Sequence, residues 1–303
     1  MIAQHHPFST RAYIEAAAGG AQLVDVPGWK TSVLARHIPG TDYRDAIGCY
    51  PFLPFAPHVD IARGLAELKA EGIVSVVLVT DPLHEPPAGG LSEFDLCRPY
   101  KTHYMFDRSL GPIDYTRRRW REVKQARDDL RIAEVDYAAY ASEFSRLYGN
   151  LINQHEIVGA AAFDNQFFDA LKNVPCIRAV AAWAGDDLVS MMTFVAFEGT
   201  AYSYLAGTTP EGRARRAHYG LYAEALEGFM DAHILNLGGA PGFEDDPEHG
   251  IVHVKRKLTN TTRMSLLCGA VLVPEIYASL MTENSTNRIA GPESFFPAYR
   301  SPR

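Results

Sequence analysis

The chain has 303 residues, of which 47% are hydrophobic, and 36 acidic against 29 basic side chains give it a net charge of −7. This length accommodates two domains, and the negative charge argues against a protein whose whole surface binds nucleic acid, although it leaves room for a local basic patch. No apolar run approaches the length of a membrane span, and the N-terminus lacks the basic-then-apolar pattern of a signal peptide. We therefore expect a cytoplasmic protein with no membrane partner.

The cysteines are spread along the chain and have no spacing typical of a metal site. All four (Cys49, Cys97, Cys176 and Cys268) stand beside apolar residues. This setting favours buried free thiols over metal ligands or nucleophiles.

The first part of the chain predicts a helix over residues 10–20 and a strand over 29–40. Residues 42–58 are rich in aromatic residues and contain three prolines, which disfavour a helix or a central strand. We predict a loop here, which either packs over the core or forms a wall of a substrate cleft with Tyr50.

Residues 58–72 have the pattern of an amphipathic helix that ends at glycine, and 73–83 that of a buried strand. A further alternating strand is predicted over 98–109, where Lys101 and His103 are candidate substrate contacts.

Residues 115–130 predict a strongly basic helix whose buried stripe consists of Trp120, Val123 and Leu130. Its arginines have two interpretations. They form a solvated face with ion pairs such as Arg118–Glu122, or they contact phosphates, for which the candidates are Arg117, Arg118 and Arg121.

The second part begins with predicted helices over 136–156 and 164–173. A meander of strands follows over 176–185, 188–199 and 200–210, then a helix over 213–231 and a short buried strand over 233–239. A meander followed by a crossover helix and a buried strand predicts a mixed sheet that contains a parallel pair.

Three stretches of this part resemble a known family: AYSYLAGTTPEG (201–212), AHYGLYAEALEGFMDAHILNLGG (217–239) and GIVHVKRKL (250–258). Their order and spacing are similar to the core of the GNAT acyltransferase superfamily, and within it to the Fem-type aminoacyltransferases. In that branch these places hold a tyrosine-rich strand, a helix before a short strand and Gly-Gly, and an apolar-Lys-Arg strand.

The resemblance implies an α/β protein (α+β, with mixed sheets) built from two GNAT-like halves, each a mostly antiparallel mixed sheet flanked by helices. Residues 58–83 repeat the helix, glycine and buried strand of 213–239, which agrees with a degenerate N-terminal copy. We expect an N-terminal GNAT-like domain over 1–134 and a C-terminal acyltransferase domain over 135–303.

The candidate catalytic residues are Lys255, His253 and Tyr204. Lys255 matches the lysine of the family's apolar-Lys-Arg strand, and the resemblance implies that it contacts the acyl donor or the charge formed at the reacting carbonyl. We read residues 251–260 as a strand, which places His253 on the same face, as a proton acceptor or a structural histidine.

Two further side chains are candidate substrate contacts. Tyr202 shares a strand face with Tyr204, so both either pack in the core or line the cleft. Asn236 precedes two glycines and must be hydrogen-bonded, so it either orders the glycine turn or lines the cleft.

The donor has two candidate forms. Acyl-CoA enzymes of the superfamily carry a glycine-spaced turn that holds a pyrophosphate, but this chain has EGRARRAHYG (211–220), whose glycine spacing is wrong. Arg213, Arg215 and Arg216 suit a nucleic-acid phosphate equally well.

We therefore expect an N-acyltransferase that moves an aminoacyl group from aminoacyl-tRNA to an amine of a small molecule or peptide. The resemblance implies direct transfer without a covalent intermediate, metal or bound cofactor, and the absence of nucleophile, P-loop, zinc and Rossmann motifs agrees with it. The alternatives are an acyl-CoA-dependent N-acyltransferase with a degenerate pyrophosphate loop and a non-catalytic binding module.

Overall fold

The computed structural model describes residues 5–84, 89–113, 116–155, 161–242, 245–283 and 295–301. The chain forms two compact units. Unit 1 contains Lys101–Met264 together with the residues up to Pro7, and unit 2 contains Phe8–Tyr100 and Ser265–Arg303.

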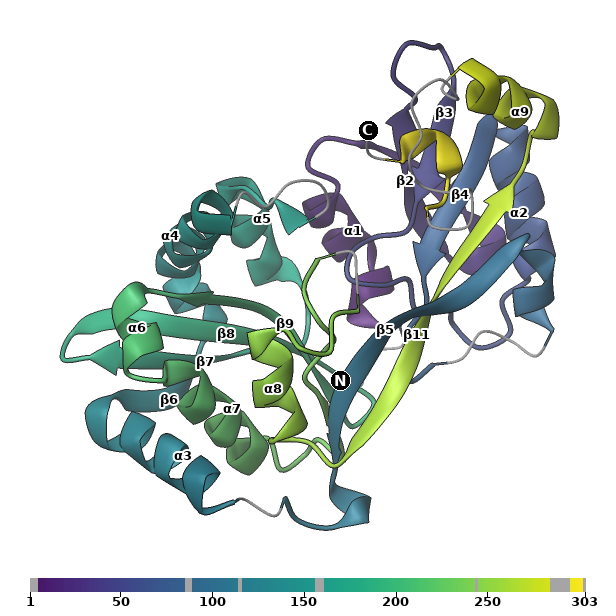
Figure 1. Ribbon diagram of the computed structural model, residues 1–303. Helices are drawn as coiled ribbons and strands as arrows, with labels where there is room; N and C mark the ends of the chain where they lie inside the picture. Colours follow the sequence, from purple (N-terminus) through teal and green to yellow (C-terminus); the bar gives the residue numbers. More distant parts are fainter. Residues whose placement is uncertain are drawn as a thin grey trace. The chain divides into compact units, whose positions relative to one another are not determined.

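Unit 1 holds most of the second half of the chain (Figure 1). Its elements are β5 (Leu96–Asp107, of which Lys101–Asp107 belong here), α3 (Arg117–Asp129), β6 (Arg131–Val135), α4 (Tyr137–His155), α5 (Asn165–Ala170), β7 (Ile177–Ala184), β8 (Asp187–Phe197), β9 (Thr200–Thr208), α6 (Pro210–Ala214), α7 (Ala217–Gly228), β10 (Ile234–Asn236) and α8 (Gly250–Arg256).

The strands of unit 1 lie in the order β5-β10-β9-β8-β7-β6. All neighbours in this order are antiparallel except β9 and β10, which are parallel. Helix α4 packs on one face of the sheet, and α3 and α7 cover the other (Figure 1). The crossover from β9 to β10 passes through α6 and α7, as a parallel pair requires.

The core of unit 1 follows from the apolar alternation of β7, β8 and β9. Phe194 and Val180 are fully buried on the face that receives Leu221 and Ala225 of α7. The single helix expected over 213–231 is two helices, because Arg216 adopts a left-handed backbone conformation with φ of 59° between α6 and α7.

The strands of unit 2 lie in the order β1-β2-β3-β4-β11. Its elements are α1 (Arg11–Ala17), β1 (Gln22–Val26), β2 (Thr31–His37), β3 (Arg44–Ile47), α2 (Ile61–Ala70), β4 (Ile73–Val79), β11 (Thr261–Val271, of which Ser265–Val271 belong here), α9 (Pro274–Glu283) and the 3-10 turn η8 (Ala298–Arg300).

The two units repeat one topology. In unit 2 the parallel pair is β3 and β4, joined through α2, and β11 runs antiparallel to β4. In unit 1 the parallel pair is β9 and β10, joined through α6 and α7, and β5 runs antiparallel to β10. The expectation of two GNAT-like halves with mixed sheets is confirmed.

The compact units do not follow a single cut of the chain. Residues 101–134 group with the second half, because β5 pairs with β10, and residues 265–303 group with the first, because β11 pairs with β4. The predicted domain boundary between residues 134 and 135 concerns the two copies of the fold along the sequence, and it stays a prediction.

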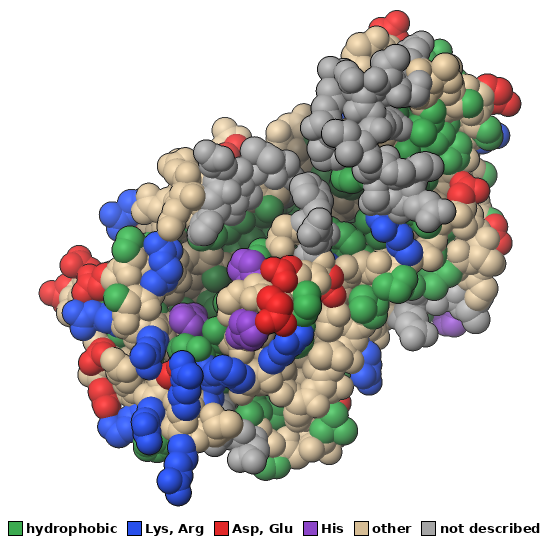
Figure 2. Space-filling model, viewed as in Figure 1, with side chains coloured by type: hydrophobic (Ala, Val, Ile, Leu, Met, Phe, Trp, Pro, Cys, Tyr) green, Lys and Arg blue, Asp and Glu red, His purple; other side chains and the backbone are tan. Residues whose placement is uncertain are grey.

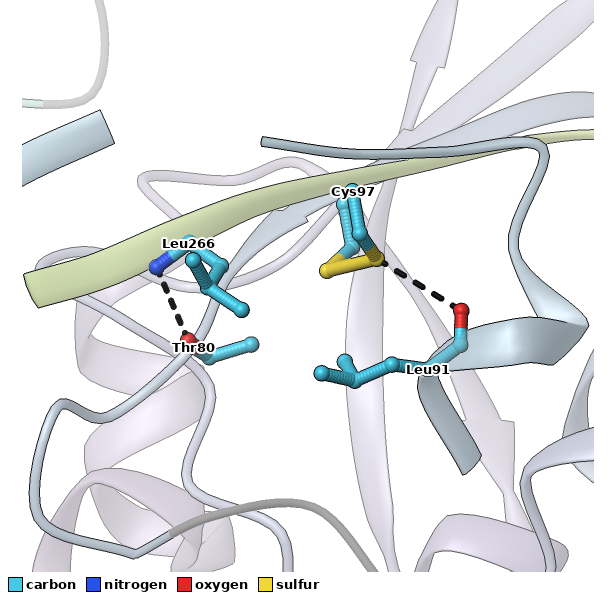
Figure 3. Close-up of a disulfide and its surroundings, with 5 residues drawn as sticks. Thr80, Leu91, Cys97 and Leu266 are labelled. Atoms are coloured by element: carbon cyan, nitrogen blue, oxygen red, sulfur yellow. Dashed lines mark hydrogen bonds between the residues drawn. A yellow bond between two sulfur atoms is a disulfide. The ribbon is translucent and has the colours of Figure 1, made fainter. Parts of the chain in front are cut away.

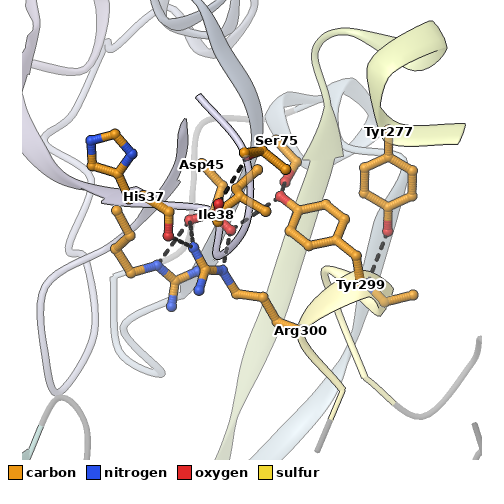
Figure 4. A network of polar contacts seen from close by, with 10 residues as sticks. His37, Ile38, Asp45, Ser75, Tyr277, Tyr299 and Arg300 are labelled. Atoms are coloured by element: carbon orange, nitrogen blue, oxygen red, sulfur yellow. Dashed lines mark hydrogen bonds and ion pairs between the residues drawn. The ribbon is translucent and has the colours of Figure 1, made fainter. Parts of the chain in front are cut away.

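The end of the chain is held to unit 2 by a buried carboxylate (Figure 4). Asp45 is fully buried and accepts hydrogen bonds from Arg36, Arg300 and the hydroxyl of Tyr299. The same hydroxyl lies 2.7 Å from Oγ of Ser75, and Arg300 also donates to the carbonyl of His37. One anion thus joins β2, β3 and η8.

Two cysteines that we expected to be free thiols form a disulfide in unit 2 (Figure 3). Cys97 of β5 and Cys268 of β11 are bonded although 171 residues separate them, and their Cα atoms lie 4.3 Å apart. Cys49 is a buried free thiol whose pKa burial raises to about 12, whereas Cys176 is exposed. The expectation of buried free thiols is therefore correct only for Cys49. The disulfide could not be predicted from the sequence because its two cysteines are so far apart in the chain.

Two other predictions are wrong. The segment 42–58 contains β3, a central strand of unit 2, because all of its prolines follow that strand. On α3 the side chain of Trp120 is 58% exposed, whereas Arg119 and Glu122 are buried in its place. An ion pair of 2.9 Å and the packing of Arg119 over the ring of Tyr219 make this burial possible.

Candidate functional site

The parallel strands β9 and β10 of unit 1 separate after three residues. Their register ends where Asn236 faces Tyr202, and β9 continues to Thr208. The chain after β10 stays with β5 instead, through hydrogen bonds of 2.8 Å from Leu237 N to Tyr104 O and of 3.2 Å from Tyr104 N to Gly238 O.

In unit 2 the corresponding strands stay together. After β3 the backbone continues beside β4, through bonds from Gly48 N to Val77 O and from Leu53 N to Val79 O, at 2.9 and 2.8 Å. The separation of the parallel strands is thus a feature of unit 1. A backbone edge without a neighbouring strand is a place where an extended ligand can bind.

Buried polar side chains gather at the point where β9 and β10 separate. Oδ1 of Asn236 accepts a hydrogen bond of 2.8 Å from Gly238 N and one of 3.2 Å from Nδ1 of His103. Asn236 is 1% exposed and His103 9%. Asn236 therefore orders the glycine turn, one of its two predicted roles.

Lys255 completes this group, which we call the lysine cluster: Lys101, His103, Asn236 and Lys255 around Gly238 and Gly239. The Nζ atom of Lys255 donates a hydrogen bond of 2.6 Å to the carbonyl oxygen of Gly239. Each glycine is required for its own reason. Gly238 has φ of +74°, a backbone conformation that other residues rarely adopt, and a Cβ on Gly239 would lie 2.9 Å from the carbonyl oxygen of Thr102.

The two lysines of the cluster influence each other electrostatically. Lys101 and Lys255 are 6% and 8% exposed. Burial and then the neighbouring charge of Lys101 lower the pKa of Lys255 to about 7. A buried lysine whose pKa lies this far below its ordinary value is typical of functional sites.

Lys255 lies on helix α8 and not on the predicted strand over 251–260. The sequence has two periods here. Val252 and Val254 alternate as in a strand, but Ile251, Val254 and Leu258 recur at helical spacing and pack in the core. Nδ1 of His249 accepts from Ile251 N at 3.2 Å and caps the helix.

This correction separates His253 from Lys255, because residues two apart lie on different faces of a helix. The side chain of His253 is 46% exposed and pairs with Glu248 at 3.5 Å. His253 is not in the lysine cluster.

The predicted tyrosines lie beside the separation of the strands. Tyr202 and Tyr204 are buried on β9, at 2% and 9% exposure. The ring of Tyr202 contacts that of His6, with centroids 5.1 Å apart. Sequence reasoning did not find His6, because nothing in its surroundings links it to β9.

Tyr50 belongs to unit 2, and its carbonyl oxygen accepts a hydrogen bond from the hydroxyl of Tyr13. Burial raises the pKa of its own hydroxyl. Tyr50 is a half-buried residue of unit 2, and the substrate contact predicted for it stays a prediction.

The arginines predicted for donor binding after β9 have different surroundings. Arg213 donates to the carbonyl of Thr208 and to Gln154, and Arg215 pairs with Glu211 at 3.0 Å. Arg216 adopts the left-handed conformation before α7. Near it lies His218, whose pKa burial and then the charge of Arg119 lower to about 4.

Arg117, Arg118 and Arg121, the other predicted donor contacts, are exposed on α3. Arg118 pairs with Glu122 at 3.5 Å, as expected. Lys and Arg side chains gather where α3, α6 and α7 lie, at the lower left (Figure 2). The molecule thus has a basic region despite its negative net charge.

No protein-family model matches the sequence, and no curated protein matches it. In the described part of the chain, no helix has both the length and the hydropathy needed to cross a membrane.

Solved structures are similar to the whole chain. The C-terminal domain of a putative lysylphosphatidylglycerol synthetase from Agrobacterium fabrum has a TM-score of 0.61 at 11% identity, over 90% of this chain and 95% of that one. FemX has a TM-score of 0.56 at 11% identity, over 91% and 96%. The L-PGS of Bacillus licheniformis has 0.52 at 12%, over 86% and 92%.

At these identities the similarity concerns the fold. The chain has the Fem-like GNAT fold that its sequence resembles.

Proposed function

We propose that this protein is an N-acyltransferase that forms an amide bond, with aminoacyl-tRNA as the donor and an amine of a small molecule or peptide as the acceptor. The observation that carries the proposal is the position of Lys255, a buried lysine of low pKa held at the glycine turn where β9 and β10 separate.

In this proposal the acyl group binds where β9 and β10 separate, beyond Tyr202 and Asn236. The protonated Nζ of Lys255 approaches the reacting carbonyl and stabilises the negative charge that forms on its oxygen when the amine attacks. One such donor contributes about 3 kcal/mol in enzymes. The charge of Lys101 increases this attraction.

Direct transfer needs no covalent intermediate. The amine nitrogen forms a bond with the acyl carbon, and the bond from that carbon to the ribose oxygen of the donor breaks. One proton of the amine passes to the ribose oxygen, directly or through solvent, so that the tRNA leaves with a free ribose hydroxyl. Holding the two reactants together supplies much of the acceleration.

The backbone between β9 and α7 favours tRNA over CoA as the donor. Gly212 N donates to Thr209 Oγ1, and Arg213 N, Arg215 N and Arg216 N donate to carbonyls of the same turn, at 2.9 to 3.0 Å. Amides that would hold a pyrophosphate are thus engaged within α6. We therefore assign the phosphate contacts to the arginine side chains, with Arg213 and Arg215 exchanging their present partners Gln154 and Glu211 for phosphate.

Binding titrations test the donor. Purified protein is titrated separately with CoA and with mixed aminoacylated tRNA at two salt concentrations. We expect salt-sensitive binding of tRNA and no binding of CoA. Binding of CoA alone would support the acyl-CoA alternative, and binding of neither would support the non-catalytic one.

A further inference from the structure

Helix α3 presents its largest apolar side chain to solvent. Trp120 is 58% exposed, whereas the charged side chains of Arg119 and Glu122 are buried at 1% and 6%. Burying an ion pair is generally less favourable than burying an apolar group of similar size. The orientation of α3 thus leaves an aromatic ring in contact with water and places a charged pair in the interior.

The exposed face of α3 joins the indole to cations. Arg117, Trp120, Arg121 and Lys124 recur at the spacing of one helix face, and all four are exposed. We call them the tryptophan stripe. Between residues 117 and 131 the chain has seven basic and three acidic residues.

The two arginines of the tryptophan stripe lack the partners that other α3 cations have. Arg118, Lys124 and Arg127 pair with Glu122, Asp128 and Glu227. Over the described ranges, neither Arg117 nor Arg121 has a carboxylate within 4.0 Å. The stripe thus offers two uncompensated guanidinium groups on either side of an exposed aromatic ring.

We propose that the tryptophan stripe binds RNA, with the ring of Trp120 stacked on an unpaired base and Arg117 and Arg121 on the flanking phosphates. This inference rests on the proposed function and locates a donor contact on α3. Basic side chains with an aromatic ring among them match the alternation of phosphates and bases in unpaired RNA.

The composition of the stripe favours RNA over a lipid surface. A helix that lies in a membrane interface needs a broad apolar face. On α3 the small apolar face, including Val123 and Ala126, is buried, and Trp120 is the one large apolar side chain in the stripe.

Tryptophan fluorescence provides a direct test. The chain has three tryptophans, and Trp29 and Trp183 are buried, so iodide quenching in the free protein reports mainly on Trp120. The probes are a twelve-nucleotide unstructured RNA, deacylated tRNA and vesicles containing phosphatidylglycerol. We expect both RNAs to change the emission and to protect it from iodide. Trp120→Ala, which removes the stacking ring, is expected to weaken RNA binding as measured by the mobility shift of labelled RNA, a readout that does not need the indole.

Variants of the arginines distinguish phosphate contacts in the tryptophan stripe from a general attraction of RNA to basic residues. Arg117→Ala with Arg121→Ala is expected to lower the slope of log affinity against log salt by about 1.4, two contacts at about 0.7 each. Arg127→Ala, at an ion-paired residue outside the stripe, is the matched control and should change the slope by less than half as much.

Unchanged fluorescence with RNA, an unchanged slope in the double variant, or a response to vesicles alone would overturn the proposal. Failure of the transferase function is distinguishable from failure of the stripe. RNA binding that depends on Trp120 without any transfer would contradict the function only, and transfer that is unaffected by the stripe variants would contradict the stripe only.

Discussion

Nζ of Lys255 donates a hydrogen bond of 2.6 Å to the carbonyl oxygen of Gly239, one residue past the glycine that Asn236 holds. This bond joins helix α8 to the place where β9 and β10 separate. It fixes a buried amine beside the separation of the two strands, which is the arrangement that our proposed mechanism needs.

Replacing Lys255 by Met should abolish most of the activity and yet stabilise the protein. We expect kcat to fall by about 100-fold or more, because one donor to the developing oxyanion is lost. Circular dichroism, which should show an unchanged fold, and transfer assays check this. Activity within a factor of two of the wild type would remove Lys255 from the mechanism.

The stability gain of Lys255→Met should depend on pH. The folded-state pKa is about 7 and the ordinary value 10.5, so between these values the unfolded chain binds a proton that the folded chain lacks. Wild-type stability therefore rises with pH across this window. The advantage of the variant should be largest at pH 6 and decrease by pH 10, as denaturant unfolding can measure, and an advantage independent of pH would argue against the low pKa.

Replacing Lys101 by Met should raise the pKa of Lys255, because a neighbouring like charge is removed. Burial remains, so the pKa should stay below 10.5. The 13Cε chemical shift of Lys255, followed by NMR against pH, measures the value directly. Lys69→Met, at an exposed residue of α2, is the control. A pKa of Lys255 that is equal in the wild type and in Lys101→Met would show that the two charges are not coupled.

Gly239→Ala should impair the lysine cluster. Its Cβ would lie 2.9 Å from the carbonyl oxygen of Thr102 and 3.2 Å from Cβ of Lys101, so the turn must move away from β5. We expect a loss of about 1–3 kcal/mol in the free energy of unfolding together with weaker activity. Gly149→Ala, on α4 with open space around it, should be neutral or stabilising. Equal stabilities of the two variants would contradict the packing described here.

Asp45→Ala should destabilise unit 2 by about 3 kcal/mol, because Arg36 and Arg300 lose a buried partner. Thermal unfolding measures the effect. Asp25 pairs with Arg11 at the surface, with 69% of the Asp25 side chain exposed, so Asp25→Ala should cost less than about 1 kcal/mol. A cost for Asp45→Ala as small as that of Asp25→Ala would show that the buried network contributes little.

The fold was largely predictable because its main signals are local. The apolar alternation of β7, β8 and β9, and the glycines after β10, specify strands and turns without reference to distant residues. Residues 250–258 were misread because they satisfy the strand and the helix period at once, and the contact of Val252 with Tyr104 that helps place α8 is not local.

The site was predictable only in part, because some of its residues have local signals and others meet through distant contacts. Lys255 and Asn236 were found from motifs, and their meeting with Lys101 and His103 depends on the pairing of β5 with β10, more than a hundred residues apart. The disulfide of Cys97 and Cys268 and the burial of Arg119 likewise depend on tertiary contacts that no local pattern reveals.

A single-turnover assay tests the central claim most directly. Wild-type protein and Lys255→Met are incubated with mixed, isotopically labelled aminoacyl-tRNA and a panel of amines and short peptides, and labelled amides are detected by mass spectrometry. We predict an amide product with the wild type and at least about 100-fold slower formation with the variant. Absence of any aminoacyl product with the wild type, together with acyl transfer from acyl-CoA under the same conditions, would contradict the account.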